Sequence, residues 1–158
     1  MGPVVSLAHY QKIRFYLLQA QKEGATFHTG DIPPEHPVGY WIAPVVLTGL
    51  SCSSIVVKEE IFGPVVTISA FETEEESIFL ANDNPNGLAS IVLTNDVTRM
   101  RRVGEQLDAG LVWVNCWLTR ELGTAFGGMK ASGVGREGGD HSRDVFTHVR
   151  TLHVPSTW

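Results

Sequence analysis

The sequence predicts an α/β fold in which helices connect parallel strands. Three apolar runs read as strands, at 65–71, 88–94 and 111–114, and helical patterns separate them at 73–82 and 96–110. The connections are short, and the strands are apolar almost throughout. This pattern favours right-handed strand–helix–strand crossovers and a parallel sheet covered on both faces.

The chain begins with an amphipathic helix from Leu7 to Gly24. Ser6 can cap its start, and Gly24 can supply the left-handed residue that ends it. Its apolar positions recur at helical spacing: Tyr10, Ile13, Leu17 and Ala20. Three prolines make 31–39 a loop, and 40–42 is strand-like.

The two later helices carry start and stop signals. Thr73 followed by Glu76 is a capping box for a helix that ends near Asn82. Asp96 caps the next helix, which Gly110 ends. One face of that helix is apolar: Met100, Val103 and Leu107.

A glycine-rich segment, 116–139, follows the last predicted strand of the sheet. Glycine at this density belongs to a shaped loop rather than to regular elements. Ligands of open α/β sheets bind outside the carboxyl ends of strands, so the loop is a candidate site wall. The segment 149–154 reads as an edge strand, which gives a domain at 1–148 and a terminal strand and tail at 149–158.

Composition excludes several classes of function. The 158 residues carry a net charge of −5 without a basic stripe, which argues against nucleic acid as a partner. No apolar run is long enough to span a bilayer, and the start lacks the pattern of a signal peptide. Two cysteines outside a CxxC spacing favour reduced thiols, and hence the cytosol or an organelle matrix; of these we expect a cytoplasmic location. The scattered histidines show no metal-ligand spacing.

Two local patterns suggest chemistry but lack the right context. Gly133 to Gly138 matches GxGxxG, yet no buried strand precedes it and no complete strand–helix–strand unit follows. Cys116 stands directly after a strand, as reactive groups often do, and Cys52 lies in a serine-rich turn. Neither has a histidine or lysine beside it in the sequence, so buried, unreactive cysteines are favoured, and no catalytic nucleophile is assigned.

Four segments together resemble successive signatures of the aldehyde dehydrogenase superfamily, in that family's order and over essentially the whole chain. They are 58–65 (KEEIFGPV), 84–89 (NPNGLA), 110–115 (GLVWVN) and 126–137 (FGGMKASGVGRE). The segment 115–122 (NCWLTREL) is similar to enzymes that oxidise 2-aminomuconic or 2-hydroxymuconic semialdehyde. One departure is Ala125, where the family usually has proline.

The resemblance implies four site residues. Glu60 would bind the nicotinamide ribose hydroxyls of NAD and Phe62 would pack near the nicotinamide ring, while Arg120 would bind a substrate carboxylate and Phe126 would line the aldehyde channel. For Glu60 and Arg120 the alternative is a solvated surface charge, and for the two phenylalanines it is ordinary packing. The choice between NAD and NADP stays open.

The same resemblance implies that the catalytic cysteine, the glutamate base and the dinucleotide-binding domain precede this chain. Two interpretations therefore stay open. In one, the chain is the C-terminal part of an NAD-dependent dehydrogenase that oxidises a carboxylated semialdehyde, and the segment alone is inactive. In the other, it is a free-standing, non-catalytic remnant that serves as a binding or interaction module. The family also implies a homo-oligomer, a dimer or tetramer, with the terminal strand joining a partner's sheet.

Overall fold

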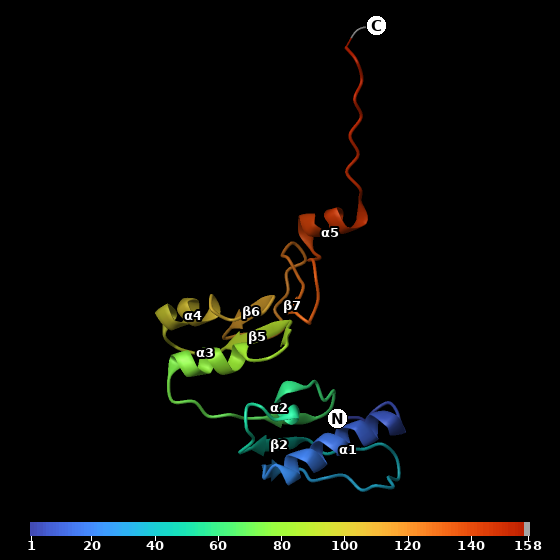
Figure 1. Ribbon diagram of the computed structural model, residues 1–158, viewed down its shortest axis with the longest axis vertical. Coiled ribbons are helices and arrows are strands. Elements are labelled where there is room, and N and C mark those ends of the chain that lie inside the picture. Colours follow the sequence, from blue (N-terminus) through green and yellow to red (C-terminus); the bar gives the residue numbers. More distant parts are fainter. Residues whose placement is uncertain (157–158) are drawn as a thin grey trace. The chain divides into compact units, whose positions relative to one another are not determined.

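A computed structural model describes residues 1–156 of the chain (Figure 1). The residues form two units, Met1–Thr73 and a second unit that starts at Glu74, and each has its own sheets. No helix within residues 1–156 is long and apolar enough to cross a membrane.

The first unit contains a long helix, α1 (Leu7–Lys22), and a single-turn helix, α2 (Ile55–Lys58). Ser6 caps α1 as predicted, because its hydroxyl accepts a hydrogen bond from the backbone N–H of His9. Gly24 has a φ of 83°, the left-handed conformation expected after the helix end. The predicted start and stop of this helix are confirmed.

The sheet of the first unit has the strand order β1–β2–β3: Thr26–Thr29, Val45–Thr48 and Val65–Thr67. β1 pairs with β2 antiparallel, whereas β2 pairs with β3 parallel across α2. The prediction of a strand at 40–42 is wrong. The strand starts at Val45, after Pro44, where pairing with β3 begins: the N–H of Val45 donates to the carbonyl of Pro64 at 2.8 Å.

The hydrophobic core of the first unit lies between α1 and this sheet. Tyr10, Ile13, Leu17 and Ala20 have no exposed surface, which confirms the predicted apolar face of the helix. Val45 and Leu47 of β2 oppose them and are equally buried. Each such side chain contributes about 1.5–3 kcal/mol when it leaves water, so this cluster fixes where α1 lies.

Up to residue 156, the second unit contains three helices and four short strands. The helices are α3 (Glu74–Asn82), α4 (Val97–Gly104) and α5 (Gly139–Phe146), and the strands are β4 (Asn86–Gly87), β5 (Ala89–Val92), β6 (Leu111–Val114) and β7 (Met129–Lys130). β5 and β6 are parallel neighbours joined through α4, and β4 pairs with β7 antiparallel. The strand–helix–strand unit predicted for this part of the chain is present.

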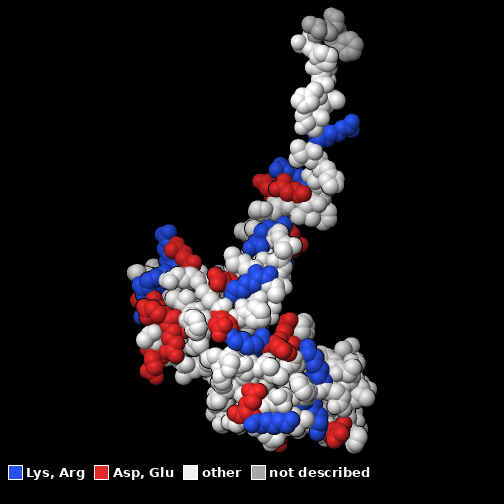
Figure 2. Space-filling view, in the orientation of Figure 1, with Lys and Arg blue, Asp and Glu red and all other residues white. Residues whose placement is uncertain are grey.

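Ion pairs connect α3 with α4. Glu74 accepts hydrogen bonds from Arg99 at 2.9 Å and from Arg102 at 2.6 and 2.8 Å. Figure 2 shows acidic and basic side chains interspersed on this surface. Hydrogen bonds from Arg102, and secondarily from Arg99, lower the pKa of Glu74 to about 2.

Several predicted boundaries and pairings differ from the structure. The strand at 65–71 ends at Thr67, and it pairs with β2 rather than with the two strands of the second unit. The helix predicted to reach Gly110 ends at Gly104, because the chain then turns so that the N–H of Gly110 donates to Gly87. A single parallel sheet of three strands is therefore not found among residues 1–156.

The expected coverage of the strands on both faces is also not observed. Val66 of β3 is 51% exposed and Ile91 of β5 is 45% exposed, because no helix among residues 1–156 covers those faces. Residues 147–156 form no strand within this chain, and residues 157 and 158 of the expected terminal segment lie outside the described residues. The pairing of 149–154 with a partner stays a prediction.

Candidate functional site

Glu60 and Phe62 lie in the loop that joins α2 to β3. They line an open groove of about 360 Å³ together with neighbouring residues such as Val57 and Thr67. The Phe62 ring is 67% exposed, and the residue has a φ of 60°. An aromatic residue seldom adopts this left-handed conformation, so the loop conformation must be stabilised by its surroundings.

The two adjacent glutamates of this loop have different environments. The Tyr16 hydroxyl donates to the Glu59 carboxylate at 2.6 Å. This hydrogen bond, and secondarily burial, raises the pKa of Tyr16. The Glu60 carboxylate is exposed, and no hydrogen bond or ion pair joins it to another side chain in the part of the chain that the structure describes. Of the two, Glu60 is therefore the one available to a ligand.

Arg120 and Phe126 lie in the loop that follows β6. Asn115, with a φ of 52°, turns the chain out of the strand, and its side-chain amide pairs with both backbone groups of Thr94 at the end of β5. The indole N–H of Trp113 donates to the carbonyl of Thr119 at 2.8 Å. These contacts fix the backbone directly before Arg120 to the carboxyl end of the β5–β6 pair.

The structure brings Arg120 and Phe126 together and adds a third residue, Glu137. The Arg120 guanidinium donates to the Glu137 carboxylate at 2.8 Å, and its carbon lies 4.4 Å from the centre of the Phe126 ring. Phe126 and Glu137 also form an antiparallel bridge. The backbone N–H of Phe126 donates to the carbonyl of Glu137 with an N to O distance of 2.7 Å, and the N–H of Glu137 donates to the carbonyl of Phe126 at 2.8 Å. The sequence interpretation did not include Glu137, although it closes the 126–137 motif.

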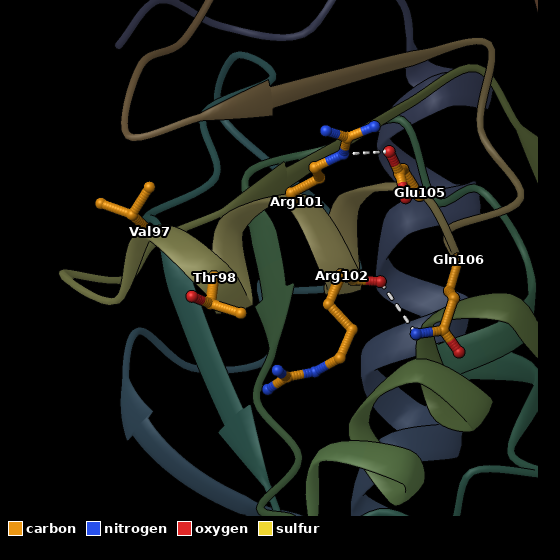
Figure 3. A pocket seen from close by; sticks show the side chains of 6 residues that line it. All are labelled: Val97, Thr98, Arg101, Arg102, Glu105 and Gln106. Carbon is orange, nitrogen blue, oxygen red and sulfur yellow. Dashed lines mark hydrogen bonds and ion pairs between the residues drawn. The ribbon is translucent and has the colours of Figure 1, made fainter.

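A larger hollow of about 520 Å³ lies along α4 and contains none of the predicted site residues. It is lined by Val97, Thr98, Arg101, Arg102, Glu105 and Gln106 (Figure 3). Arg101, Glu105 and Gln106 bond within the protein: Arg101 donates to Glu105 at 2.7 Å, and Gln106 donates to the carbonyl of Arg102 at 2.8 Å. These side chains already have partners on or near α4, so we assign no ligand site to this hollow.

The cysteines are less buried than expected from the sequence. Cys116 is exposed and Cys52 is half-buried, and both are free thiols. The reason is the turn at Asn115, which carries the next residue away from the strand. Among residues 1–156, no three His, Cys, Asp or Glu side chains gather as a metal site requires.

Comparison with known proteins identifies the family. The family model described as "Aldehyde dehydrogenase family" matches residues 1–152. The chain belongs to the aldehyde dehydrogenase family. It is 48% identical to a 2-hydroxymuconic semialdehyde dehydrogenase of Pseudomonas sp. strain CF600, over 97% of this chain and 32% of that protein. It is 46% identical to the 2-aminomuconic semialdehyde dehydrogenase of Bos taurus, over 98% of this chain and 33% of that protein.

Solved structures give this aldehyde dehydrogenase chain the α/β fold of the family. An aldehyde dehydrogenase from Bacillus cereus, determined as an NAD+ complex, matches with a TM-score of 0.91 and 38% identity. The match covers 99% of this chain and 32% of that structure. The chain thus spans about a third of the length of the relatives that it matches.

Proposed function

We propose that this chain forms the C-terminal part of an NAD-dependent aldehyde dehydrogenase that oxidises a carboxylated semialdehyde, of the 2-aminomuconic semialdehyde type, to its acid. The observation that carries the proposal is the environment of Arg120. Its guanidinium is about half-exposed and binds a carboxylate oxygen of Glu137 at 2.8 Å. A substrate with a carboxylate remote from its aldehyde would find a matching planar donor there.

Arg120 has donors left for a substrate. A guanidinium offers five N–H donors, and Glu137 occupies a position beside only one of its terminal nitrogens. The ring of Phe126 covers one face of the guanidinium and restricts its orientation. In the proposed role, Arg120 orients the substrate through its carboxylate, and Phe126 forms part of the wall of the aldehyde channel.

The residues of the first unit fit the proposed cofactor. The free Glu60 carboxylate is an acceptor suited to the two hydroxyl donors of a ribose, and the exposed Phe62 ring offers an apolar surface to a nicotinamide. When bound, NAD would accept the hydride released from the substrate. In the proposal, Glu60 and Phe62 contribute binding and orientation, while most of the cofactor contacts come from other parts of the enzyme.

The nucleophile and the base are also proposed to lie outside these 158 residues. Cys116 and Cys52 are each flanked by structural hydrogen bonds or turns and have no assigned catalytic role. The chain is proposed to supply cofactor and substrate contacts to a cytoplasmic homo-oligomer, with 149–154 joining a partner's sheet. By itself the segment is proposed to be inactive.

Exposed apolar side chains support a role within a larger protein. Val66, Ile68 and Phe71 on and after β3 are each more than half exposed, as is Phe79 on α3. Exposed large apolar side chains, where neighbouring ones form a patch, mark surfaces that further protein covers. Further protein that covers these side chains would remove the energetic cost of their exposure.

The intact mass of the native protein, captured from its source with an antibody against this chain, tests the proposal. A mass about three times the 17.3 kDa of this chain, with NAD-dependent oxidation of 2-hydroxymuconic semialdehyde, is the expected result. A native mass of 17.3 kDa, without NAD binding, would favour a free-standing binding module instead.

A further inference from the structure

One side of α1 contacts the loop that carries Glu60 and Phe62. The N–H at Nε2 of His9 donates to the carbonyl of Phe62 at 2.5 Å, and the Lys12 ammonium donates to the carbonyl of Glu60 at 3.1 Å. The Tyr16 hydroxyl donates to the side chain of Glu59 at 2.6 Å. The helix residues increase from 9 to 16 as the loop residues decrease from 62 to 59, so the two segments run in opposite directions.

These contacts come from a helical spacing. Residues 12 and 13 follow residue 9 by three and four positions, and residue 16 follows them by four and three, so all four lie on one side of the helix. Ile13 completes the row by packing against Gly63: a Cβ at Gly63 would lie 2.6 Å from the Cδ1 atom of Ile13, which is too close. Because Ile13 and Tyr16 are buried in the core, this side of the helix is fixed in place.

The loop needs such contacts to keep its conformation. Phe62 has a left-handed backbone, which free aromatic residues avoid, while its ring is mostly exposed and gains little from packing. The hydrogen bond from His9 reaches the carbonyl of this same residue. The contact from Lys12 holds Glu60 by its backbone and leaves the Glu60 carboxylate unused.

We propose that His9, Lys12 and Tyr16 are positioning residues that hold the 59–63 loop in the conformation that presents Glu60 and Phe62 to the cofactor. The inference deepens the proposed function, and it rests on the proposed roles of Glu60 and Phe62. It also assigns different tasks to the adjacent glutamates: Glu59 anchors the loop through Tyr16, and Glu60 faces the ligand.

Lys12→Met in the protein at its native length tests the inference. The change removes the donor but keeps most of the aliphatic chain, and Lys12 is exposed, so the core is unaffected. Hydrogen exchange of the backbone amides of residues 60–63 is expected to become about tenfold faster, because a charge-assisted hydrogen bond is lost. The Kd for NAD is expected to rise about three- to tenfold, with a smaller change in kcat at saturating NAD.

Two further variants are matched to this experiment. Lys12→Arg keeps a cationic donor and is expected to retain most of the protection and affinity. Lys22→Met removes the same charge from the last turn of the same helix and is expected to change neither. Unchanged exchange of residues 60–63 in Lys12→Met, or an equal effect of Lys22→Met, would overturn the positioning role.

A Glu60→Gln variant separates this inference from the proposed function. If Glu60→Gln leaves NAD affinity unchanged while Lys12→Met still accelerates exchange, the ribose role fails and the loop-holding role of α1 stands. If Glu60→Gln weakens NAD binding and Lys12→Met alters neither readout, the ribose role stands and the positioning role fails.

Discussion

Arg120 is bound by Glu137 at 2.8 Å while the ring of Phe126 lies against its guanidinium at 4.4 Å. The backbone bridge between Phe126 and Glu137 places these two partners side by side. These two contacts restrict the orientation of the Arg120 side chain. In its proposed role, less side-chain entropy would then remain to be lost on binding a substrate carboxylate.

Replacing Arg120 with alanine is expected to raise KM for a carboxylated semialdehyde about tenfold to a hundredfold, because a charge-assisted hydrogen bond is lost. The KM for propanal, which has no carboxylate, should change little. Arg120→Lys keeps the charge but loses the planar arrangement of donors. Its KM for the carboxylated semialdehyde should therefore lie between those of the parent enzyme and Arg120→Ala. Steady-state kinetics of the full-length enzyme on both aldehydes checks this prediction. Equal losses on the two substrates would contradict the carboxylate role.

Glu60→Gln is expected to weaken NAD binding about three- to tenfold and to change the free energy of unfolding by less than about 0.5 kcal/mol. The reason is that the Glu60 side chain is exposed and makes no contact that the fold requires. Titration of the enzyme with NAD and denaturant unfolding measure the two quantities. Glu23→Gln, at the C-terminal end of α1, is the control for loss of a surface charge. Unaltered NAD affinity in Glu60→Gln would argue against the ribose contact.

Glu74 is expected to contribute to acid sensitivity. Its pKa in the folded protein is about 2, below the ordinary value of 4.5, because Arg102 and Arg99 bind the charged form. A lowered folded pKa means that its stabilisation is complete above about pH 4.5 and is lost as the pH falls toward 2. Urea unfolding between pH 6 and about pH 2.5 should therefore show a shallower decline for Glu74→Gln than for the parent. Glu75→Gln is the control, and a parallel decline in Glu74→Gln and the parent would contradict the prediction.

Gly110→Ala is expected to destabilise the protein by about 2–3 kcal/mol, because a Cβ there would collide with the carbonyl of Gly127. Gly104 provides a matched comparison at the end of α4. A Cβ at Gly104 would meet only Val112, at an ordinary 3.7 Å, so Gly104→Ala should be neutral or stabilise by about 0.5 kcal/mol. Denaturant unfolding measures the free energy of unfolding of both variants. Similar values for the two would contradict the prediction and would mean that the backbone around Gly127 moves aside at little cost.

The sequence predicted α1 well because its signals were local and agreed with one another. Its apolar face, its Ser6 cap and the glycine at its end each act within a few residues. The strand Thr26–Thr29 was missed, since it is short and polar and is defined by its pairing with β2. The strand beginning at Val45 was placed too early, because aromatic residues at 40–42 gave a stronger strand signal than the residues after Pro44.

The roles of the candidate site residues stay predictions, but their surroundings can be compared with what the sequence indicated. Family motifs indicated Glu60, Phe62, Arg120 and Phe126, but they did not indicate which residues hold them. Glu137 reaches Arg120 only because the loop folds back to form the bridge at Phe126. The row from His9 to Tyr16 meets the 59–62 loop only once α1 packs on the sheet. Contacts between residues this distant in sequence depend on tertiary structure, which periodicity and caps do not encode.

The boundary between Thr73 and Glu74 separates the two proposed tasks along the chain: Glu60 and Phe62 precede it, and Arg120, Phe126 and Glu137 follow it. If the proposed roles hold, changes after this point would alter which aldehyde is accepted, while the proposed nicotinamide contacts before it would be kept. An exchange of the part after this boundary between two relatives would transfer Arg120, Phe126 and Glu137 together as one block.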